Sequence, residues 1–316
     1  MFRKGIRVPL KGGLGNQLFQ YHAGLYVAKR CSQPLYLDLT GVQFDRAHHE
    51  LVIDKLNFEG KLLYAKHRYS ILSIRQHLRN LLLSRDLTNP SKRKRFRLNK
   101  LTRTYKSPRV GFDKNLERIE GPARLEGYFQ SYKYYSALQL MGELSPKTLE
   151  LIDPSSYFLG RLSEIKARRT LVLHVRRGDY VSVMDSFGLL SVNYYVDAMS
   201  ALRQRGFSWE QVWLFTDDPT GVKSEFAQLI RDEKVELIHF DSYSNPAEEM
   251  ILMSHANICV IANSTFSWWA ACLSETTQAV VCPSKWFKNS EDPVDLYPSH
   301  WIKVLPSWIS DWSTNF

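Results

Sequence analysis

Short apolar runs alternate with longer segments of helical periodicity throughout the second half of the chain. The predicted strands span residues 170–175, 211–216, 235–240, 258–262 and 279–282, and the predicted helices between them span residues 192–205, 221–230, 246–255 and 265–273. Strands and helices in strict alternation indicate a doubly wound parallel sheet. We therefore expect an α/β domain whose strands all deliver their following loops to one edge of the sheet.

The first half of the chain opens with the same pattern and then becomes less regular. Its predicted elements are strands at residues 6–10, 34–39 and 125–130 and helices at residues 18–30, 71–83 and 132–140. The first strand runs into a glycine-rich turn and a helix, which is a Rossmann-like opening. Pro146, Pro154 and Gly160 interrupt the pattern near the middle of the chain. We therefore predict two domains, residues 1–150 and 151–316, with the last segment able to pack back on the first domain.

Composition and charge narrow the classes of partner. The chain has 316 residues, 44% of them hydrophobic, which allows two packed domains. Its formal net charge of +10 favours nucleic acid, an anionic membrane surface or a phosphorylated substrate. The excess gathers between Arg68 and Arg109, where Asp86 is the single acid. That segment is either a solvated face, or a contact for the anionic inner leaflet of a membrane or for the pyrophosphate of a lipid-linked oligosaccharide.

Cysteine spacing and hydropathy bear on the cellular compartment. Cys31, Cys259, Cys272 and Cys282 form neither a CxxC motif nor a Cys/His metal-ligand pattern, which fits a reducing compartment. The amino-terminal residues lack the apolar core of a signal peptide, and no window approaches about 18 uncharged apolar residues. We expect a cytoplasmic protein, able to rest at the inner face of the membrane, that uses no metal or other cofactor.

The segment after the first strand of the second domain carries the densest chemistry. An apolar run ends in His174, and Arg176, Arg177, Gly178 and Asp179 follow. Ligands of open parallel sheets bind at the carboxyl ends of the strands. A guanidinium stays charged and its planar fork bonds phosphate oxygens bidentately, so two arginines at this point suit a diphosphate. The alternative is a surface arginine pair that closes a strand.

Two further loops follow strands of the same sheet. Ser264, Thr265 and Phe266 begin a predicted helix, whose hydroxyls and N–H groups at the positive end of the dipole can bind an anion as well as cap the helix. Asp217 and Asp218 are adjacent carboxylates that point in different directions. Helix capping by Asp218 ahead of a proline is therefore a better interpretation than a metal site.

The glycine-rich turn at residues 12–17 is not the spaced GxGxxG fingerprint of dinucleotide binding, and no acidic ribose partner follows at the expected distance. The sequence also contains no GxSxG, HExxH, P-loop or kinase signature. Transfer of a sugar from a nucleotide diphosphate suits the remaining picture, a diphosphate-binding sheet that faces an aromatic-rich second domain.

Four segments resemble glycosyltransferase family 11, the α-1,2-fucosyltransferases. They are residues 12–21 (GGLGNQLFQY), 127–130 (GYFQ), 174–180 (HVRRGDY) and 262–270 (ANSTFSWWA), in the family's order. The resemblance implies a GT-B-like fold, in which two Rossmann-type domains face each other across a cleft. It also implies GDP-β-L-fucose as donor and metal-independent, inverting transfer to the 2-hydroxyl of a galactose. The acceptor would be a galactose-terminated oligosaccharide of the surface polysaccharide or O-antigen type, which can be lipid-linked.

The resemblance further implies which residues bind the donor. Arg176 matches the arginine that grips the donor β-phosphate, and Arg177 or the helix end at Ser264 and Thr265 would add to that charge. Such pre-placed hydrogen-bond donors stabilise the negative charge of the leaving diphosphate as its bond to the sugar breaks. His174 would lie near the nucleotide.

Other roles implied by the resemblance concern the base and the sugar. Glu249 would accept hydrogen bonds from guanine, although relatives often carry Asp there, and Asn16 would lie close to the donor sugar across the cleft. Asp179 and His22 are the candidates for accepting the proton of the acceptor hydroxyl. A strongly dissociative route needs no dedicated base.

Two rival functions remain open. One is a fucosyltransferase of another linkage or a transferase of another GDP-hexose, because the Arg-Arg-Gly-Asp loop is shared more widely than the linkage. The other is a basic nucleic-acid-binding protein, which the net charge suggests. The basic segment has few interleaved aromatics and no nucleic-acid-binding signature, so we expect no nucleic acid partner. Acceptor specificity is expected in the first domain, in the loops at residues 38–50 and 127–135.

Overall fold

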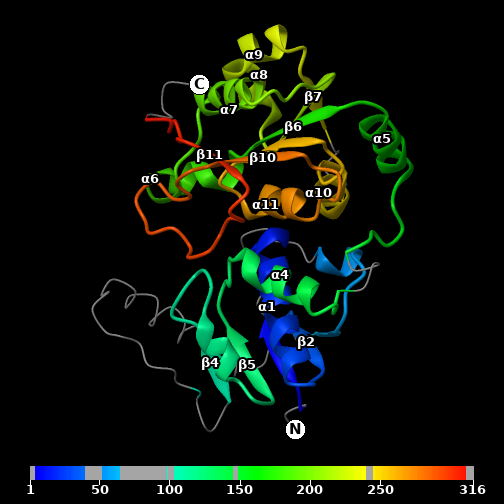
Figure 1. Cartoon of the computed structure of the whole chain (residues 1–316), viewed down its shortest axis with the longest axis vertical. Coiled ribbons are helices and arrows are strands. Elements are labelled where there is room, and N and C mark those ends of the chain that lie inside the picture. Colours follow the sequence, from blue (N-terminus) through cyan, green and yellow to red (C-terminus); the bar gives the residue numbers. More distant parts are fainter. Residues whose placement is uncertain are drawn as a thin grey trace.

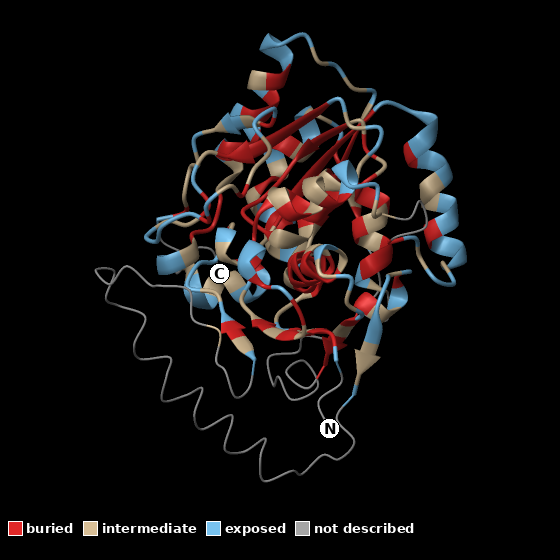
Figure 2. Cartoon of the chain, turned by 60° about the horizontal axis from the view of Figure 1, so that its bottom comes forward, coloured by how far each residue is buried: buried red, intermediate tan, exposed pale blue. Residues whose placement is uncertain are grey.

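The computed structural model describes residues 4–39, 52–64, 98, 103–144, 149–239 and 245–310. These residues form two parallel β-sheets, one in each half of the chain, with helices between and around them (Figure 1). Buried residues run through the strands of both sheets and through the helices between them (Figure 2). The two α/β units face each other, so the expected GT-B-like architecture is confirmed.

The first sheet has the strand order β3-β2-β1-β5-β4, with all neighbours parallel. Its strands are β1 (Ile6–Pro9), β2 (Leu35–Asp38), β3 (Lys61–Leu63), β4 (Thr104–Lys106) and β5 (Ala123–Glu126). The helical elements of this half are α1 (Leu14–Arg30), η1 (Ile53–Lys55), η3 (Lys114–Arg118) and α4 (Tyr132–Leu140). Ile6 and Val8 of β1 are fully buried whereas Arg7 between them is partly exposed. This alternation places one apolar face of the sheet against α1.

The second sheet has the strand order β11-β10-β9-β6-β7-β8 and is also entirely parallel. Its strands are β6 (Thr170–Val175), β7 (Gln211–Thr216), β8 (Glu236–Ile238), β9 (Ile258–Val260), β10 (Ala279–Pro283) and β11 (Ile302–Val304). The helical elements are α5 (Ser156–Ala167), η4 (Gly178–Val183), α6 (Met184–Phe187), α7 (Val192–Gln204), α8 (Pro219–Glu225), α9 (Ala227–Asp232), α10 (Pro246–Met253) and α11 (Thr265–Cys272). Every residue of β6 and of β10 is buried, as expected for a parallel sheet covered on both faces.

One apolar cluster connects the two sheets through α1 and α11. It contains Val8 of the first sheet and Val172 of the second. The ring of Phe19 on α1 lies 4.5 Å from that of Trp268 and 5.0 Å from that of Trp269 on α11. The helices approach so closely at Gly15 that a Cβ there would lie 2.4 Å from the carbonyl carbon of Thr265. The opposite face of the second sheet packs with α7 and α8 in a separate cluster.

Two segments link the halves of the chain. Ser155, just before α5, donates its N–H and its hydroxyl to Glu248 at 2.7 and 2.6 Å, which ties the connection to α10. The boundary predicted after residue 150 falls in this connection between α4 and α5. The loop between β10 and β11 returns to the first half, where the carbonyl oxygen of Asp295 accepts a hydrogen bond from the Ser131 hydroxyl at 2.7 Å. Near the end of the described residues, Trp308 pairs with Leu190 of the second half. The predicted packing of the last segment on the first domain stays a prediction.

The structure shifts the ends of several predicted elements. The helix predicted from residue 18 begins at Leu14, because the extended residue Gly13 precedes its first turn. The strand predicted to residue 130 ends at Glu126, and Phe129, three residues later, takes a left-handed φ of 55° that no strand residue adopts. The helix predicted at 221–230 is divided into α8 and α9 at Phe226. The three-residue strands β3, β4 and β11 were not predicted, and the helix predicted at 71–83 lies outside the described residues.

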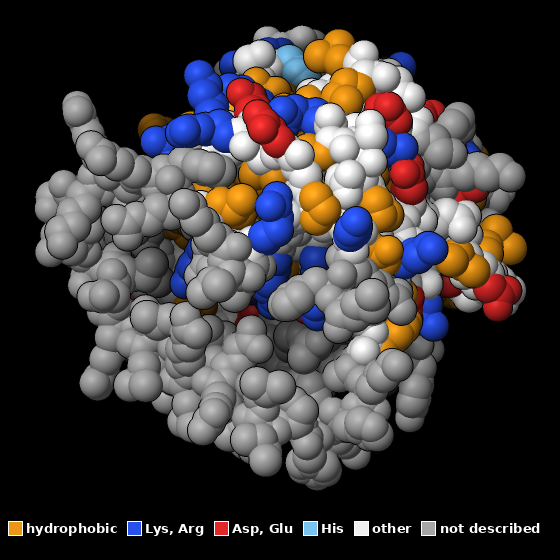
Figure 3. All heavy atoms as spheres, turned by 90° about the horizontal axis from the view of Figure 1, so that it is seen from below, with side chains coloured by type: hydrophobic (Ala, Val, Ile, Leu, Met, Phe, Trp, Pro, Cys, Tyr) orange, Lys and Arg blue, Asp and Glu red, His pale blue; other side chains and the backbone are white. Residues whose placement is uncertain are grey.

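Within the described ranges, no helix is long and apolar enough to span a bilayer. Seen from the end that carries the first sheet, the described Lys and Arg side chains are interspersed with apolar and acidic ones (Figure 3). Most of the basic segment between Arg68 and Arg109 lies outside the described residues. Its predicted contact with an anionic surface therefore stays a prediction.

Candidate active site

Arg176 follows the carboxyl end of β6, where two carboxylates hold its guanidinium. Its Nη2 lies 2.6 Å from Oδ1 of Asp179, and its Nη1 lies 3.0 Å from Oδ2 of Asp217 at the end of the neighbouring strand β7. Burial works to lower the pKa of Arg176, but the charges of Asp217 and Asp179 outweigh burial and raise it. The side chain is 28% exposed. Arg176 therefore remains a charged group at the sheet edge, held in place by partners that are themselves partly exposed.

Arg177 points the other way and does not lie at this surface. Only 1% of its side chain is exposed, and its Nη2 lies 2.7 Å from Oε2 of Glu225 at the end of α8. Its guanidinium also lies 5.9 Å from the centre of the Phe226 ring. The expectation of a clamp of two arginines on the diphosphate is therefore corrected, because Arg177 forms a buried ion pair beneath the loop.

Gly178 allows the loop to fold back over Asp217. Its φ is 22°, and a Cβ at this position would lie 2.2 Å from Oδ2 of Asp217. The N–H of Arg177 also donates to Oδ1 of Asp217 at 2.8 Å. Asp217 thus orients the loop by accepting the backbone N–H of Arg177, and it orients the side chain of Arg176 by its charge. This role of Asp217 was not predicted from the sequence. Asp218 accepts from the N–H of Gly221 at 3.0 Å and caps α8, as predicted.

His174 lies on the same side of β6 as Arg176 and is 3% exposed. Burial, with a further contribution from the charge of Arg176, lowers the pKa of His174 to about 3. Its ring lies 5.8 Å from that of Phe266 on α11, and its Nδ1 has no hydrogen-bond partner among the described residues. His174 is therefore a neutral ring next to the start of α11, with a buried polar atom left to satisfy.

The amino terminus of α11 lies against the amino terminus of α1. Ser264 is the N-cap residue of α11, is 4% exposed and makes no side-chain capping bond. The backbone of Thr265 and Phe266 approaches Gly15 in the first turn of α1. Neither helix has an acidic residue in its first turn. Two positive helix ends therefore converge where the halves of the chain meet, which favours an anion there.

Glu249 lies in the first turn of α10, within the electrostatic influence of Asp217 and Arg176. Burial and the charge of Asp217 raise the pKa of Glu249 to about 7, while the charge of Arg176 opposes them. Glu249 remains partly exposed, whereas the adjacent Glu248 is 5% exposed and bonded to Ser155. Of the two neighbouring acids, only Glu249 is presented on the side of Arg176.

Asn16 contributes from the first half of the chain. Its Oδ1 accepts a hydrogen bond from Nε2 of Gln130 at 2.8 Å, which joins the start of α1 to the turn after β5. Gln17 donates to the carbonyl oxygen of Gly12 at 2.9 Å. Gln20 accepts from the N–H of Lys11 at 2.9 Å and donates to its carbonyl oxygen at 3.1 Å. The glutamines of the amino-terminal motif thus fix the loop that faces α11.

His22 does not lie at this opening. It is 1% exposed, its ring stacks on that of Trp269 at 4.5 Å, and its Nδ1 donates to the carbonyl oxygen of Leu18 at 2.8 Å. Burial lowers the pKa of His22 to about 3, and the bond to Leu18 only partly opposes this. A ring enclosed between two helices cannot reach an acceptor hydroxyl, so the structure corrects its assignment as a candidate base. Asp179, with 54% of its side chain exposed, stays a candidate.

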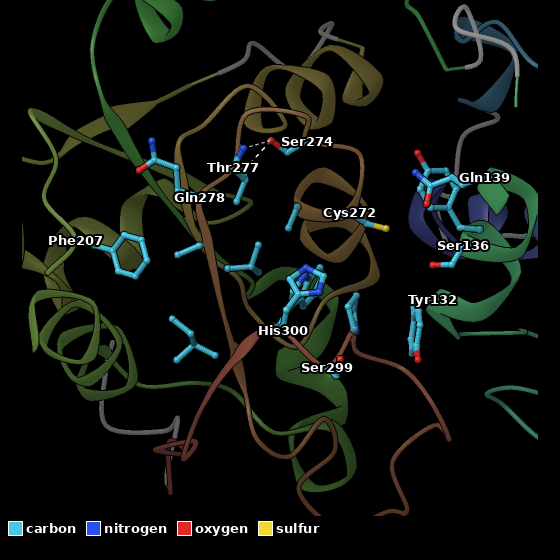
Figure 4. A pocket seen from close by; sticks show the side chains of 17 residues that line it. Tyr132, Ser136, Gln139, Phe207, Cys272, Ser274, Thr277, Gln278, Ser299 and His300 are labelled. Carbon is cyan, nitrogen blue, oxygen red and sulfur yellow. Dashed lines mark hydrogen bonds between the residues drawn. The ribbon is translucent and has the colours of Figure 1, made fainter. Parts of the chain in front are cut away.

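A cavity of about 390 Å³ opens at the amino ends of the strands of the second sheet, opposite the ends that carry Arg176 (Figure 4). α4 contributes Tyr132, Ser136 and Gln139 on one side, and Cys272 and His300 lie across from them. The cavity lies at the amino ends of β10 and β11, whereas Arg176 follows the carboxyl end of β6. In the described part of the chain, its lining includes none of the residues predicted to bind the donor, and no cluster of His, Cys, Asp and Glu is arranged to hold a metal ion.

Several known proteins are similar to this chain in sequence. An α-1,2-colitosyltransferase of Escherichia coli is 28% identical over 93% of this chain and 97% of its own length. The O-antigen biosynthesis glycosyltransferase WbnK of Escherichia coli is 26% identical over 93% and 99%. A galactoside 2-α-L-fucosyltransferase of Caenorhabditis elegans is 25% identical over 56% and 51%.

Among solved structures, the fucosyltransferase NodZ from Bradyrhizobium matches with a TM-score of 0.44 and 12% identity over 88% of this chain and 95% of its own. The ADP-heptose lipopolysaccharide heptosyltransferase II of Escherichia coli matches with a TM-score of 0.47 and 12% identity over 95% and 90%. The family model described as glycosyl transferase family 11 matches residues 5–304. The chain belongs to glycosyl transferase family 11.

Proposed function

We propose that this protein transfers L-fucose from GDP-β-L-fucose to the 2-hydroxyl of a galactose, with inversion at the sugar carbon. The observation that carries the proposal is the charged, partly exposed Arg176 at the carboxyl end of β6, next to the converging ends of α1 and α11. Family membership and the names of the relatives support a sugar donor carried on a nucleotide. The acceptor is a galactose-terminated oligosaccharide, either free or lipid-linked.

The donor diphosphate binds between Arg176 and the start of α11. Negative charge grows on the leaving diphosphate as the fucosyl–oxygen bond breaks, and Arg176 and the N–H groups at Ser264, Thr265 and Phe266 stabilise it. A pre-placed donor of this kind contributes about 3 kcal/mol to lowering the barrier in a site that excludes water. Asp179 and Asp217 release part of their hold on Arg176 when phosphate oxygens replace them. These groups supply the positive charge, so we propose that the reaction proceeds without a metal.

The nucleoside lies towards α10. Glu249 in its ionised form accepts two hydrogen bonds from the N1–H and N2–H groups of guanine. The unpaired Nδ1 of His174 is a further partner for the donor, since a buried polar atom without a bond is costly. Asn16 approaches the fucose from the first half of the chain. Asp179 is positioned to accept the proton of the acceptor hydroxyl, or the proton goes to solvent along a dissociative route.

A donor and acceptor screen tests this proposal directly. The purified chain is incubated with lactose and GDP-fucose or GDP-mannose, with and without EDTA, and the linkage of any product is assigned by NMR. We expect an α-1,2-fucosylated galactoside from GDP-fucose only, at the same rate with EDTA. A β-linked or 3-linked product, or product from GDP-mannose alone, contradicts the proposal.

Transfer of colitose is a second candidate, because the Escherichia coli relative that covers most of this chain is named for it. The same screen with GDP-colitose separates the two, since kcat/KM for the two donors ranks them. A higher value for GDP-colitose assigns the chain to colitosyl transfer.

A further inference from the structure

The turn after β5 turns one aromatic side chain inward and its neighbour outward. Phe129 is fully buried with a φ of 55°, a left-handed conformation that costs a non-glycine residue strain. Its ring occupies the space beside Gly127, where a Cβ would lie 2.7 Å from the ring. Strain of this kind persists only where the surroundings enforce it, and such residues cluster at functional sites. Phe129 continues the buried side of Leu125, and Tyr128 continues the exposed side of Glu126, so Tyr128 is presented outward next to Glu126.

Tyr128 is an exposed ring held in a fixed place. Its side chain is 38% exposed, and the ammonium of Lys11 lies 3.9 Å from the centre of the ring. The backbone of Lys11 is fixed, because both its N–H and its carbonyl oxygen are bonded to the side chain of Gln20. Burial lowers the pKa of Lys11, the charge of Glu126 raises it and that of Lys106 lowers it. Lys11, Lys106 and Glu126 therefore lie close together beside the ring, at the carboxyl ends of β1, β4 and β5.

This group of residues adjoins the proposed donor site. Gln130, two residues after Tyr128, donates to Asn16 at 2.8 Å, and Gly15 touches the start of α11. On α11, the ring of Phe266 lies 5.8 Å from that of His174. Tyr128 is therefore linked to the contact of α1 with α11 through Gln130 and Asn16. A second substrate must approach the donor from this half of the molecule.

The chemistry beside Tyr128 fits a neutral sugar. A flat aromatic ring packs on the C–H face of a pyranose, and a carboxylate accepts hydrogen bonds from its hydroxyl groups. Glu126 supplies the carboxylate, with 33% of its side chain exposed and its Oε1 held 2.8 Å from Nε of Arg124. We propose that the terminal galactose of the acceptor packs on Tyr128 and hydrogen-bonds to Glu126, while Lys11 acts as a positioning residue for the ring. This inference rests on the proposed function for the identity of the sugar.

Replacement of Tyr128 gives the decisive test. Tyr128→Ala is expected to raise the KM for lactose at least about tenfold, while the slow hydrolysis of GDP-fucose in the absence of acceptor stays within about twofold of the wild type. Tyr128→Phe keeps the ring, so its KM for lactose and its rate of GDP-fucose hydrolysis should both stay within about threefold of the wild-type values. The matched control is Trp209→Ala, because Trp209 is also partly exposed beneath a cation, Arg203 at 4.7 Å, but lies before the amino end of β7. An unchanged KM in Tyr128→Ala, or an equal rise in the control, overturns the inference.

Lys11 and Glu126 are tested by coupling to Tyr128. Lys11→Met should raise the KM for lactose, and the double variant with Tyr128→Ala should be no worse than Tyr128→Ala alone. Additive losses would show that Lys11 acts independently of the ring and would refute its positioning role. Glu126→Gln should raise the KM for lactose. A 2-deoxy-galactoside lacks the reacting hydroxyl and can only inhibit, so its Ki should stay unchanged if Glu126 bonds the 2-hydroxyl and should rise equally if Glu126 bonds another hydroxyl. No rise for either sugar removes Glu126 from the site.

A binding measurement separates this inference from the proposed function. Saturation-transfer NMR of lactose with the chain saturated in GDP requires no sugar transfer. We expect transfer of magnetisation to the galactose protons in the wild type and its loss in Tyr128→Ala. If lactose binds in this way but no fucose is transferred, the donor assignment fails and the acceptor site stands. If lactose does not bind, or binds equally in both proteins, the acceptor site is wrong whatever the donor.

Discussion

Arg176 and Arg177 are neighbours in sequence but lie on opposite sides of the second sheet. Side chains alternate along an extended backbone, and this alternation continues past the end of β6. Val172, His174 and Arg176 share the side that faces α11, whereas Val175 and Arg177 share the side that faces α7 and α8. One arginine is therefore left available to a ligand and the other is used to bind the fold together.

The two arginines should respond differently to replacement by alanine. Arg176→Ala should lower kcat for transfer by about 100-fold or more, since it removes about 3 kcal/mol of stabilisation from the leaving group, with little change in Tm. Arg177→Ala should destabilise the fold by roughly 3–5 kcal/mol, because it leaves Glu225 without its partner in a buried ion pair. Steady-state kinetics and thermal unfolding of both variants check this. A normal kcat in Arg176→Ala would remove the proposed mechanism.

If Glu249 binds guanine as proposed, its raised pKa should make donor binding depend on pH. Its pKa of about 7 in the folded protein, against an ordinary value of 4.5, makes the carboxyl neutral below pH 7. The neutral carboxyl carries a proton that faces the N–H groups of guanine, which are also hydrogen-bond donors. The affinity for GDP-fucose should therefore fall as the pH drops through 7. Because the folded state binds this proton more tightly than the unfolded state, the same group makes the fold less stable as the pH rises from about 4.5 to 7.

Glu249→Gln should therefore change affinity and stability in opposite directions. It should weaken GDP binding on the order of 10-fold to 100-fold at pH 8 and abolish the pH dependence between 6 and 8, as loss of charged hydrogen bonds implies. It should raise Tm at pH 8 in the absence of ligand. Calorimetric titration with GDP and thermal unfolding across that range measure both effects. A Kd that is independent of pH in the wild type would show that Glu249 does not contact the base.

At the scale of elements, the contact between α1 and α11 positions the two halves of the site. Both helices begin at this contact, and Gly15 is the residue that lets their backbones meet. The aromatic rings of Phe19, His22 and Trp269 continue the contact along the helices. His22 directly follows the amino-terminal motif and was a candidate base, but its ring serves this packing.

Gly15→Ala should disrupt that contact. The new Cβ would meet backbone atoms of Thr265 at about 2.4 Å, which no side-chain rotation relieves. We expect a loss of roughly 1–3 kcal/mol in the free energy of unfolding and a higher KM for the donor, since α11 must shift. Gly160→Ala in α5 is the control, because nothing lies within 4 Å of its Cβ position and alanine favours a helix, so it should stabilise by up to about 1 kcal/mol. The free energy of unfolding of both variants is measured with denaturant. If Gly15→Ala and Gly160→Ala change it in the same direction, the close contact at Gly15 does not explain the effect.

The strand and helix pattern of the second half could be predicted from the sequence because long buried strands produce unmistakable apolar runs. β6 and β10 were predicted in place, and the loops that follow the strands meet at one edge as parallel topology requires. The short strands β3, β4 and β11 stand in mixed polar and apolar stretches, whereas β8 and β9, equally short, were predicted from the apolar residues in and around them. The three unpredicted strands join the sheets through partners distant in sequence, which only the folded chain reveals.

The site shows the same limit. Arg176 could be singled out from its place after a buried strand. Arg177 could not be told apart from it, because its ion-pair partner Glu225 is distant in sequence. The alternation of β5, continued past its end, fits an outward Tyr128 and an inward Phe129, but the left-handed φ of Phe129 cannot be predicted from it. Local pattern therefore predicted where the candidate residues lie along the chain, and long-range packing decides which of them stay available to a ligand.

For the whole molecule, the shared apolar core predicts that the two halves unfold together. Domains joined by small polar contacts move and melt separately, but here Val8 of β1 and Val172 of β6 belong to one cluster through the aromatic rings of α1 and α11. Unfolding followed by tryptophan fluorescence and by far-UV circular dichroism should therefore give one coincident transition.

GDP at about 100 times its Kd should raise the free energy of unfolding of the whole molecule by about 2.7 kcal/mol, with or without EDTA. Phe19→Ala, which removes a ring between the helices, should cost roughly 3–5 kcal/mol and split the transition in two. Two transitions in the wild type, only one of them raised by GDP, would show that the halves are independent and that the contact of α1 with α11 does not govern the site.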